Sequence, residues 1–325
     1  MKKKNRIRNT KKNILITGVT STTGRMVAEQ FYFDKRVGKI IGIGRIDKPY
    51  YFNDYSPSRF IYMKVDILKY RELHNLFISS EFRDSNINTV VHLAFVEEVS
   101  RRDLDPHTLN VEGTKNLLDM CMNTKGIKKF VFKSTIYVYK LKPNSPTIIH
   151  EGWDLNFDPT APQWIKDRVD ADMLCRSAME NDKMDIVVLR FPHIIGRNIN
   201  SQMNIYLNQR IVFKPMGFDP VINLIHSRDV VNAIQYAVHT KVKGVFNIRG
   251  RETAPLSTFL RLNKRRVIPV PPFVLSAINS IQWKLGLTDF YYPINKDFLK
   301  YNCVPSSERM EKILKFTPKN HVRFG

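Results

Sequence analysis

The fold is decided by one stretch near the amino terminus, Asn13-Ile14-Leu15-Ile16-Thr17-Gly18-Val19-Thr20-Ser21-Thr22-Thr23-Gly24. It opens with a short apolar run, as expected of a buried strand, and a helical pattern follows over 23–33. Gly18 and Gly24 stand where a tight turn would join the strand to the helix. Free backbone N–H groups and the positive end of the helix dipole lie at such a corner. The stretch therefore predicts a turn that holds the diphosphate of a dinucleotide.

Ser21 stands in this turn where a middle glycine would let the backbone come closest to the diphosphate. A serine fits after a small shift, and its hydroxyl can donate to a phosphate oxygen. We therefore expect binding that is weakened but retained. The alternative is a loop that has only a structural role.

The second apolar run, over 39–44, leads into the residues that would meet the nucleotide's ribose. It ends Gly42-Ile43-Gly44-Arg45, with no acidic residue before Asp47. A carboxylate there would bind a ribose 2′-hydroxyl, whereas Arg45 can accommodate a 2′-phosphate, so NADP is slightly favoured over NAD. Asp66, after the third run, can accept from the adenine amino group; the alternative is that it caps the next helix.

Strand-like and helix-like segments alternate from residue 13 to about residue 250. Short apolar runs predict strands buried on both faces, at 13–18, 39–44, 60–65, 89–94, 129–134 and 185–190. Helical patterns lie between them, notably over 23–33, 108–123 and 162–181. Right-handed crossovers turn such a series into one parallel sheet. We therefore predict an α/β fold with a doubly wound, Rossmann-like parallel sheet and a smaller carboxy-terminal substrate lobe.

The chain divides into three expected parts. Residues 1–12 hold seven Lys or Arg and no acid, and we expect a disordered basic tail. Residues 13–250 form the predicted NAD(P)-binding domain, with 197–224 contributing to the substrate lobe. Residues 251–325 form the lobe that caps the cleft.

A proline-led helix is predicted over 273–287 in that lobe, after Pro271 and Pro272. Its apolar side consists of Val274, Ala277, Ile278, Ile281 and Leu285. We expect this side to face the core or a second copy of the chain, which makes a homodimer a candidate assembly. A membrane interface beside Lys264-Arg265-Arg266 is the less favoured alternative.

The formal net charge of +22 attracts phosphates, acidic lipids or nucleic acid without choosing among them. We expect a solvated basic surface around a site for an anionic small molecule, with nucleic acid or a membrane surface as less favoured partners. Cys121, Cys175 and Cys303 are far apart, which fits a reducing compartment, and they have no metal-ligand spacing. We expect a cytoplasmic protein without a metal site.

Short motifs follow one another in a fixed order along residues 13–250. They are Thr17–Gly24, Val65-Asp66, Val91-His92-Leu93-Ala94, Asn110–Asn116, Val131–Thr135, Val138-Tyr139, Arg190–Gly196 and Ile225–Ile234. In order and spacing they resemble the NAD-dependent epimerase/dehydratase family, which comprises the extended and atypical short-chain dehydrogenases. The family usually binds nucleotide-sugars.

The resemblance implies a cofactor site along these motifs. It places Gly18, Ser21 and Gly24 against the pyrophosphate, Asp66 and Ile67 against the adenine, and Leu93 and Ala94 on the ribose side. With Arg45 included, the expected cofactor-binding residues are Gly18, Thr20, Ser21, Thr22, Thr23, Gly24, Arg45, Asp66, Ile67, Leu93, Ala94, Asn110, Ser134, Arg168 and Pro192.

The resemblance also implies where catalysis would take place and where it fails. Thr135 stands at the position of the catalytic Ser/Thr. Aligning Asp172 with the family's acidic residue puts Trp164 at the position of the catalytic tyrosine and Arg168 at that of the lysine. Arginine keeps a cation that can hold the nicotinamide ribose, but an indole N–H is no usable acid. Proton transfer is therefore the part that is lost.

Three residues near the predicted cleft are candidate substitute acids, namely Tyr137, Tyr139 and His193. Tyr139 is expected to pack under the sheet. His193 is the best candidate because imidazole titrates near neutral pH, although an ordinary packed histidine is the commoner case. We expect an NAD(P)-binding protein similar to an epimerase, dehydratase or reductase of nucleotide-sugars or related anionic metabolites, with altered proton chemistry. The alternatives are a catalytically inactive NAD(P)-binding sensor or scaffold and, less favoured, an RNA-binding atypical member.

Overall fold

Seven parallel strands form the central sheet of the computed structural model, which describes residues 11–95 and 108–324. Their order across the sheet is β11-β7-β5-β4-β1-β2-β3. The strands are β1 (Lys12–Thr17), β2 (Val37–Gly44), β3 (Phe60–Lys64), β4 (Thr89–His92), β5 (Lys129–Thr135), β7 (Asp185–Phe191) and β11 (Gly244–Asn247). The first six confirm the strands predicted from the apolar runs. Of the predicted tail, only residues 11 and 12 lie within the described part of the chain.

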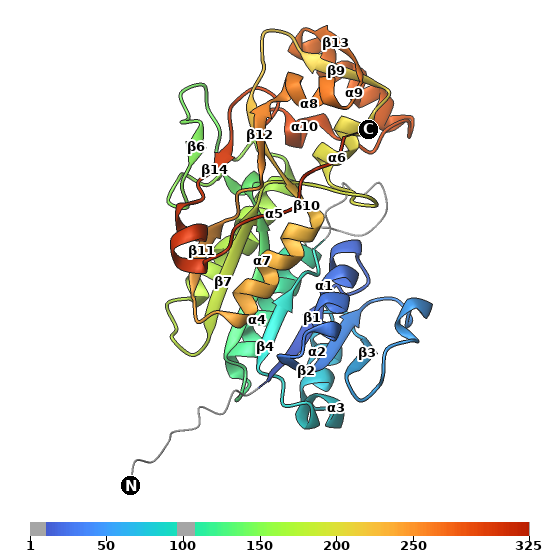
Figure 1. Cartoon of the computed structure of the whole chain (residues 1–325), viewed down its shortest axis with the longest axis vertical. Helices are drawn as coiled ribbons and strands as arrows, with labels where there is room; N and C mark the ends of the chain where they lie inside the picture. The colour runs from blue at the N-terminus through green and yellow to red at the C-terminus, as the bar shows by residue number, and fades with distance from the viewer. Residues whose placement is uncertain (1–10, 96–107, 325) are drawn as a thin grey trace.

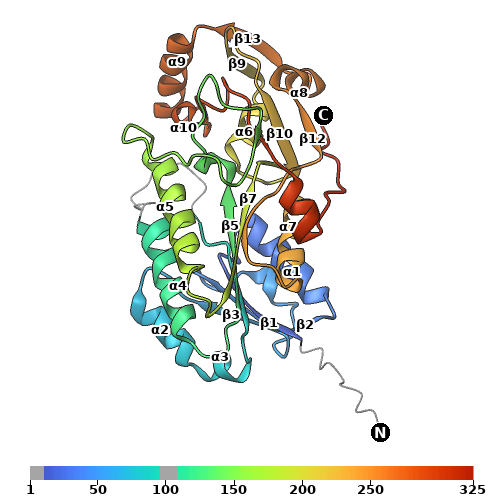
Figure 2. The same ribbon diagram turned by 90° about the vertical axis from the view of Figure 1, so that its left-hand side faces the viewer.

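Helices cover both faces of this sheet, as Figure 2 shows. One face carries α1 (Thr22–Phe33) and α7 (Ser227–His239). The other carries α2 (Tyr70–Ile78), α3 (Ser80–Asp84), α4 (Gly113–Asn123) and α5 (Gln163–Ala178). A π-helical turn, η2 (Thr108–Glu112), precedes α4 and takes up the start of the helix predicted over 108–123. The doubly wound fold is confirmed.

The strands are nearly all apolar because each face of the sheet is buried. In β1, Ile14 and Ile16 pack beside α1 and α7, while Leu15 points into the cluster on the opposite face. All three side chains are fully buried. Burying one such side chain contributes about 1.5–3 kcal/mol, so the two cores fix the sheet and the edge where its strands end.

A smaller lobe sits beyond the carboxyl ends of these strands (Figure 1). Its strands are β8 (His193–Ile195), β10 (Val221–His226) and β12 (Glu252–Pro255) in one sheet, β9 (Ile211–Pro215) beside β13 (Arg266–Val270), and β6 (Ile148–Ile149) beside β14 (Val304–Pro305). Its helices are α6 (Gln202–Asn208), α8 (Leu256–Leu262), α9 (Pro272–Lys284) and α10 (Tyr292–Asn295). Met310, Leu314 and Phe316 return to the core beside α7. The division at residue 250 stays a prediction.

The prediction that the apolar stripe of α9 faces the core is wrong. Ile281 and Leu285 are 58% and 67% exposed, whereas the buried residues of the helix are Leu275 and Asn279. The Asn279 amide donates to the carbonyl oxygen of Phe290 at 3.0 Å, and its side-chain oxygen accepts from the backbone N–H of Tyr292 at 2.8 Å. These two hydrogen bonds hold the face with Leu275 and Asn279 inward, and they leave Ile281 and Leu285 at the solvent side of the helix. Contact of the stripe with a second copy stays a prediction.

No helix in the described part of the chain combines the length and the apolar character needed to cross a bilayer.

Candidate active site and cofactor cleft

The predicted diphosphate turn lies at the corner between β1 and α1 (Figure 1). Gly18 has a φ of 66°, in the left-handed region that glycine adopts without strain. A β-carbon on Gly18 would lie 2.7 Å from the Cα and backbone nitrogen of Ala94, and one on Gly24 would collide with the carbonyl oxygen of Gly18. The turn is therefore packed tightly on its inner side. Its outer side is open, since Thr20 and Ser21 line two adjoining pockets.

Ser21 caps α1 from within this turn. Its hydroxyl accepts from the backbone N–H of Gly24 at 3.0 Å and donates to the carbonyl oxygen of Gly18 at 2.9 Å. The hydroxyl proton is thus turned toward the turn itself. Donation from Ser21 to a phosphate, which stays a prediction, requires that proton to rotate away from Gly18.

The first pocket of the cleft lies beside the ends of β2 and β3. Ile43, Val65 and Ile67 form an apolar wall, and the exposed Arg45 lines both this pocket and the next one. Asp47 is ion-paired with Lys64, with Nζ–Oδ1 at 2.8 Å. The pocket therefore offers an apolar surface and a guanidinium group.

Asp66 has a local backbone role. Its Oδ1 accepts from the backbone N–H of Leu68 at 3.1 Å, and its own N–H donates to Glu72 at 2.9 Å. Helix α2 begins only at Tyr70 and has Lys69 as its N-cap, so the alternative that Asp66 caps this helix is wrong. The neighbouring residues 65 and 67 line the pocket, and contact of Asp66 with adenine stays a prediction.

Three pockets adjoin along the carboxyl edge of the sheet. Leu93 and Phe95 line both the first pocket and a second one beside Thr22 and Thr23. Phe95 also lines the third pocket, which reaches Thr135. One cleft therefore runs from β2, past the glycine turn, to the end of β5.

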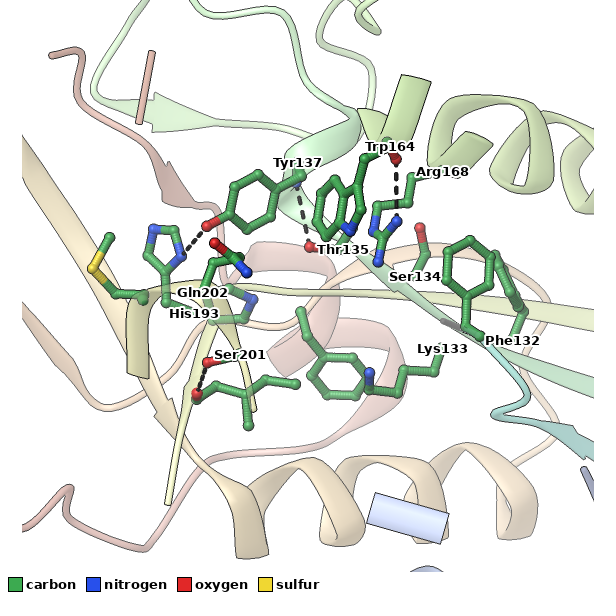
Figure 3. A pocket seen from close by; sticks show the side chains of 15 residues that line it. Phe132, Lys133, Ser134, Thr135, Tyr137, Trp164, Arg168, His193, Ser201 and Gln202 are labelled. Atoms are coloured by element: carbon green, nitrogen blue, oxygen red, sulfur yellow. Dashed lines mark hydrogen bonds between the residues drawn. The ribbon is translucent and has the colours of Figure 1, made fainter. Parts of the chain in front are cut away.

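The inner end of the cleft is built around Thr135, whose hydroxyl accepts from the backbone N–H of Tyr137 at 3.4 Å and caps η3 (Ile136–Val138). Trp164 and Arg168, one turn apart on α5, line the same pocket (Figure 3). The guanidinium carbon of Arg168 lies 3.1 Å from the centre of the Trp164 ring. One Arg168 nitrogen donates to the Trp164 carbonyl oxygen at 3.1 Å. This cation–π contact holds both side chains beside Thr135.

Tyr137 and His193 close the far wall of this pocket (Figure 3). The Tyr137 hydroxyl donates to Asn295 Oδ1 at 2.7 Å and lies 3.3 Å from His193 Nδ1. Among the described residues, the buried Nε2 of His193 has no hydrogen-bond partner. Burial raises the pKa of Tyr137 far above its usual range and lowers the pKa of His193 to about 3. Both groups are neutral at pH 7, so neither is poised to give up a proton.

A buried ion pair supports the pocket from behind. Arg190 contacts Asp172 through Nη2–Oδ1 at 2.5 Å and Nε–Oδ2 at 3.0 Å, and it donates to the Tyr139 hydroxyl at 2.9 Å. The Ser134 hydroxyl donates to Asp172 Oδ2 at 2.6 Å. Burial of the phenol, which outweighs the effect of the nearby Arg190, raises the pKa of Tyr139 to about 12. Tyr139 therefore has the structural role expected of it.

A second buried chain of hydrogen bonds runs beneath the turn. His92 lies 2.7 Å from the Thr17 hydroxyl and 3.0 Å from the Thr114 hydroxyl. The Thr114 hydroxyl in turn donates to the carbonyl oxygen of Asn110 at 2.6 Å. Asn110 is thus buried below the cleft, whereas Pro192, another predicted cofactor contact, lines its inner pocket.

Several lining residues were not predicted from the sequence, and Phe95 and Lys133 are the two that belong to more than one pocket of the cleft and carry an aromatic ring or a charge. Phe95 lines all three pockets, and Lys133 lines the second and third. The guanidinium carbon of Arg168 also lies 4.7 Å from the centre of the Phe95 ring. Lys133 carried a usable signal, since it is a charged residue directly after the apolar run Phe130-Val131-Phe132 of β5. Phe95 carried none.

The strand order and the glycine turn define a doubly wound α/β protein of the Rossmann type. The model of the NAD dependent epimerase/dehydratase family matches residues 14–248. The chain belongs to that family.

Curated relatives agree with this assignment. An uncharacterized protein of Mycobacterium tuberculosis is 26% identical over 317 residues, which cover 95% of this chain and 80% of the relative. A trifunctional UDP-glucose 4,6-dehydratase/UDP-4-keto-6-deoxy-D-glucose 3,5-epimerase/UDP-4-keto-L-rhamnose-reductase of Arabidopsis thaliana is 25% identical over 255 residues, covering 73% of this chain and 37% of the plant protein.

Solved structures share the fold. The UDP-glucuronic acid 4-epimerase of Bacillus cereus, in complex with UDP-glucuronic acid and NAD, has a TM-score of 0.69 at 19% identity and covers 95% of each chain. The UDP-glucose 4-epimerase of Thermotoga maritima, with UDP-glucose, has a TM-score of 0.71 at 17% identity and covers 95% of this chain and 94% of its own.

Proposed function

We propose that this protein binds NAD(P) along the cleft and a nucleotide-sugar or similar anionic metabolite beside Thr135, with proton chemistry that differs from the family's. One observation carries the proposal. The outer side of the glycine turn opens onto a row of three pockets from Arg45 to Thr135, each of which shares lining residues with the next. A dinucleotide needs such a path along the carboxyl edge of a parallel sheet.

The residues of the cleft fit the parts of NAD(P). Backbone N–H groups around Thr20 and Thr22 would hold the diphosphate, and Arg45 favours a 2′-phosphate because no free carboxylate competes at the end of β2. Arg168 would hold the nicotinamide ribose through its guanidinium group. When bound, the nicotinamide supplies or accepts a hydride.

An anionic metabolite is supported by the charges at the inner end of the cleft. Arg168 and Lys133 both line this pocket, and so does the buried His193, whose Nε2 has no hydrogen-bond partner among the described residues. Solved relatives from Bacillus cereus and Thermotoga maritima hold UDP-sugars. The pocket beside Thr135 has a volume of only about 60 Å³, well below that of an ordinary ligand site, so a sugar would require Trp164 or Tyr137 to move.

A second candidate function is that of a sensor or scaffold that binds NAD(P) without turnover. The stack of Trp164 on Arg168 favours it, because an indole fills the position from which the family's tyrosine transfers its proton. Tyr137 and His193 do not replace that tyrosine, since burial keeps both neutral.

Titration of NADPH fluorescence tests the proposal. We expect saturable binding to the wild-type protein and its loss in Gly18→Ala, whose new methyl group would press on Ala94. Gly217→Ala is the matched control, because Gly217 also has a positive φ, of 80°, but no atom within 4 Å of a β-carbon. Absence of wild-type binding at millimolar NADPH would overturn the proposal.

The double variant Trp164→Tyr/Arg168→Lys separates the two candidates. If the chain is a sensor, the wild type has no turnover of UDP-glucose or UDP-glucuronic acid with NAD(P), whereas the double variant can gain some. Trp283→Tyr/Arg176→Lys makes the same chemical changes away from the cleft and is expected to gain none. Wild-type turnover would eliminate the sensor.

A further inference from the structure

A further pocket lies apart from the cleft, where α6, the start of α7 and residues 319–324 meet. Basic and imidazole side chains line it, namely Arg197, His226, Arg228, Lys319, His321 and Arg323. No acidic side chain of the described residues is among its lining. The loop 196–200 separates the pocket from the cleft, since Arg197 lines the one and Asn200 the other.

Four of these cations are not neutralised. Within residues 11–95 and 108–324, the side chains of Arg197, Arg228, Lys319 and Arg323 make no ion pair. The two nearby carboxylates, Asp229 and Glu252, have other partners than these four cations. The buried Asp229 accepts from the backbone N–H groups of Lys319 at 3.2 Å and Asn320 at 2.9 Å. These bonds fix the carboxy-terminal segment against α7 and leave its side-chain charges uncompensated.

The second nearby carboxylate, Glu252, lies 2.9 Å from His321 Nδ1. The pKa of His226 depends on the charged groups around the pocket. Burial lowers its pKa; Asp229 and Glu252 oppose this, and the guanidinium groups of Arg228 and Arg323 lower the pKa further. Two arginines distant in sequence therefore act on one point of the pocket, and a bound anion would relieve their mutual repulsion.

We propose that this pocket binds a nucleoside polyphosphate. One guanidinium group can donate two parallel hydrogen bonds to a phosphate. Three arginines and one lysine can therefore bind a chain of several phosphates. The pocket has a volume of about 940 Å³, which accommodates a whole nucleotide. Met26, Leu207 and Phe324 line it as well and offer an apolar surface to a base. The site shares no residue with the cleft and does not depend on NAD(P) binding there.

A nucleic acid is the competing polyanion. It would need cations spread along a surface path at the spacing of backbone phosphates. Here the cations surround one pocket between three segments of the chain. A small polyphosphate can reach all of them at once.

Isothermal titration of ATP and of inorganic triphosphate, without NADPH, tests the proposal. We expect the wild type to bind both ligands, and Arg228→Ala/Arg323→Ala to weaken each by at least about tenfold, because each arginine contributes charge-assisted hydrogen bonds. Both residues are exposed, so the variant is expected to fold. Arg83→Ala/Lys125→Ala removes the same charge elsewhere and is expected to bind like the wild type.

The results distinguish this pocket from the cleft. The arginine variant is expected to keep NADPH binding, and Gly18→Ala is expected to keep triphosphate binding. Equal affinity of the arginine variant and the wild type would overturn the proposal. So would a single-stranded RNA 20-mer that binds more tightly than ATP and depends on the same two arginines, because the surface would then be a nucleic-acid site.

Discussion

Arg45 stands at the end of β2, exposed, and lines two of the three pockets of the cleft. The acidic side chain nearest to it along the chain, Asp47, is occupied by Lys64 at 2.8 Å. A guanidinium group in this place can pair with a 2′-phosphate in a bidentate manner, whereas a 2′-hydroxyl gains little from it. We therefore propose that Arg45 favours NADP over NAD.

Arg45→Ala is expected to weaken NADP binding by about 10- to 100-fold and to leave NAD binding nearly unchanged, because a lost charge-assisted pair is worth about 1.5–3 kcal/mol. Titration of both cofactors into both proteins measures the difference. Lys48→Ala, which removes an exposed cation nearby, is the control. Equal losses for NADP and NAD would show that Arg45 does not meet the 2′-phosphate.

Single residues also show how much of the site could be predicted from the sequence. The motif order predicts that Trp164 and Arg168 stand beside Thr135, and the three side chains do line one pocket. The stack of the guanidinium on the indole could not be predicted, because it depends on rotamers set by the surrounding packing. Phe95 was missed because an aromatic residue after a strand is ordinary. The hydrogen bonds of the Ser21 hydroxyl with Gly18 and Gly24 could not be predicted either, because they depend on the conformation of the turn.

At the scale of elements, six of the seven strands of the central sheet were predicted, whereas β11 and the strands of the lobe were not. Burial on both faces gives β1, β2 and β5 continuous apolar runs, which set them apart from their surroundings. In the lobe, β8 and β12 are three and four residues long, and their pairing with β10 is fixed by tertiary packing. The predicted orientation of α9 was wrong for a related reason. The hydrogen bonds through Asn279 orient the helix, and the apolar stripe does not.

Two alanine substitutions in α9 test this orientation. Leu275→Ala is expected to lower the free energy of unfolding by about 2–5 kcal/mol, because it leaves a cavity at a residue that is 2% exposed. Ile281→Ala removes a side chain that is 58% exposed and is expected to change it by no more than about 0.5 kcal/mol. Urea unfolding measures both. A large, concentration-dependent loss in Ile281→Ala would mean that a second copy covers the stripe.

At the scale of the whole molecule, the pH dependence of stability involves His92 and His193, two fully buried histidines of the described residues that fold in their neutral form. Burial lowers the pKa of both His92 and His193 to about 3, whereas an unfolded chain binds these protons near pH 6.5. Between these values the unfolded state holds more protons, so the free energy of unfolding falls as the pH falls. The stabilisation is complete above about pH 6.5 and decreases progressively toward pH 3.

Urea unfolding at pH 7 and pH 5 measures this loss, which we expect to be about 1–2 kcal/mol for each histidine. His193→Gln is expected to reduce the loss by about half, and His74→Gln, at an exposed imidazole, is expected to leave it unchanged. A loss that His193→Gln does not reduce would show that the ring is already protonated or accessible in the folded protein.

Hydrogen exchange with saturating NADPH tests the central claim, namely that the glycine turn and the pockets beside it hold the dinucleotide. We expect slower exchange for the amides of residues 18–24, 44–46 and 93–95, which come from three separate segments that line one cleft. Gly18→Ala should abolish the change. Protection confined to other segments, or no protection at saturating NADPH, would contradict the account.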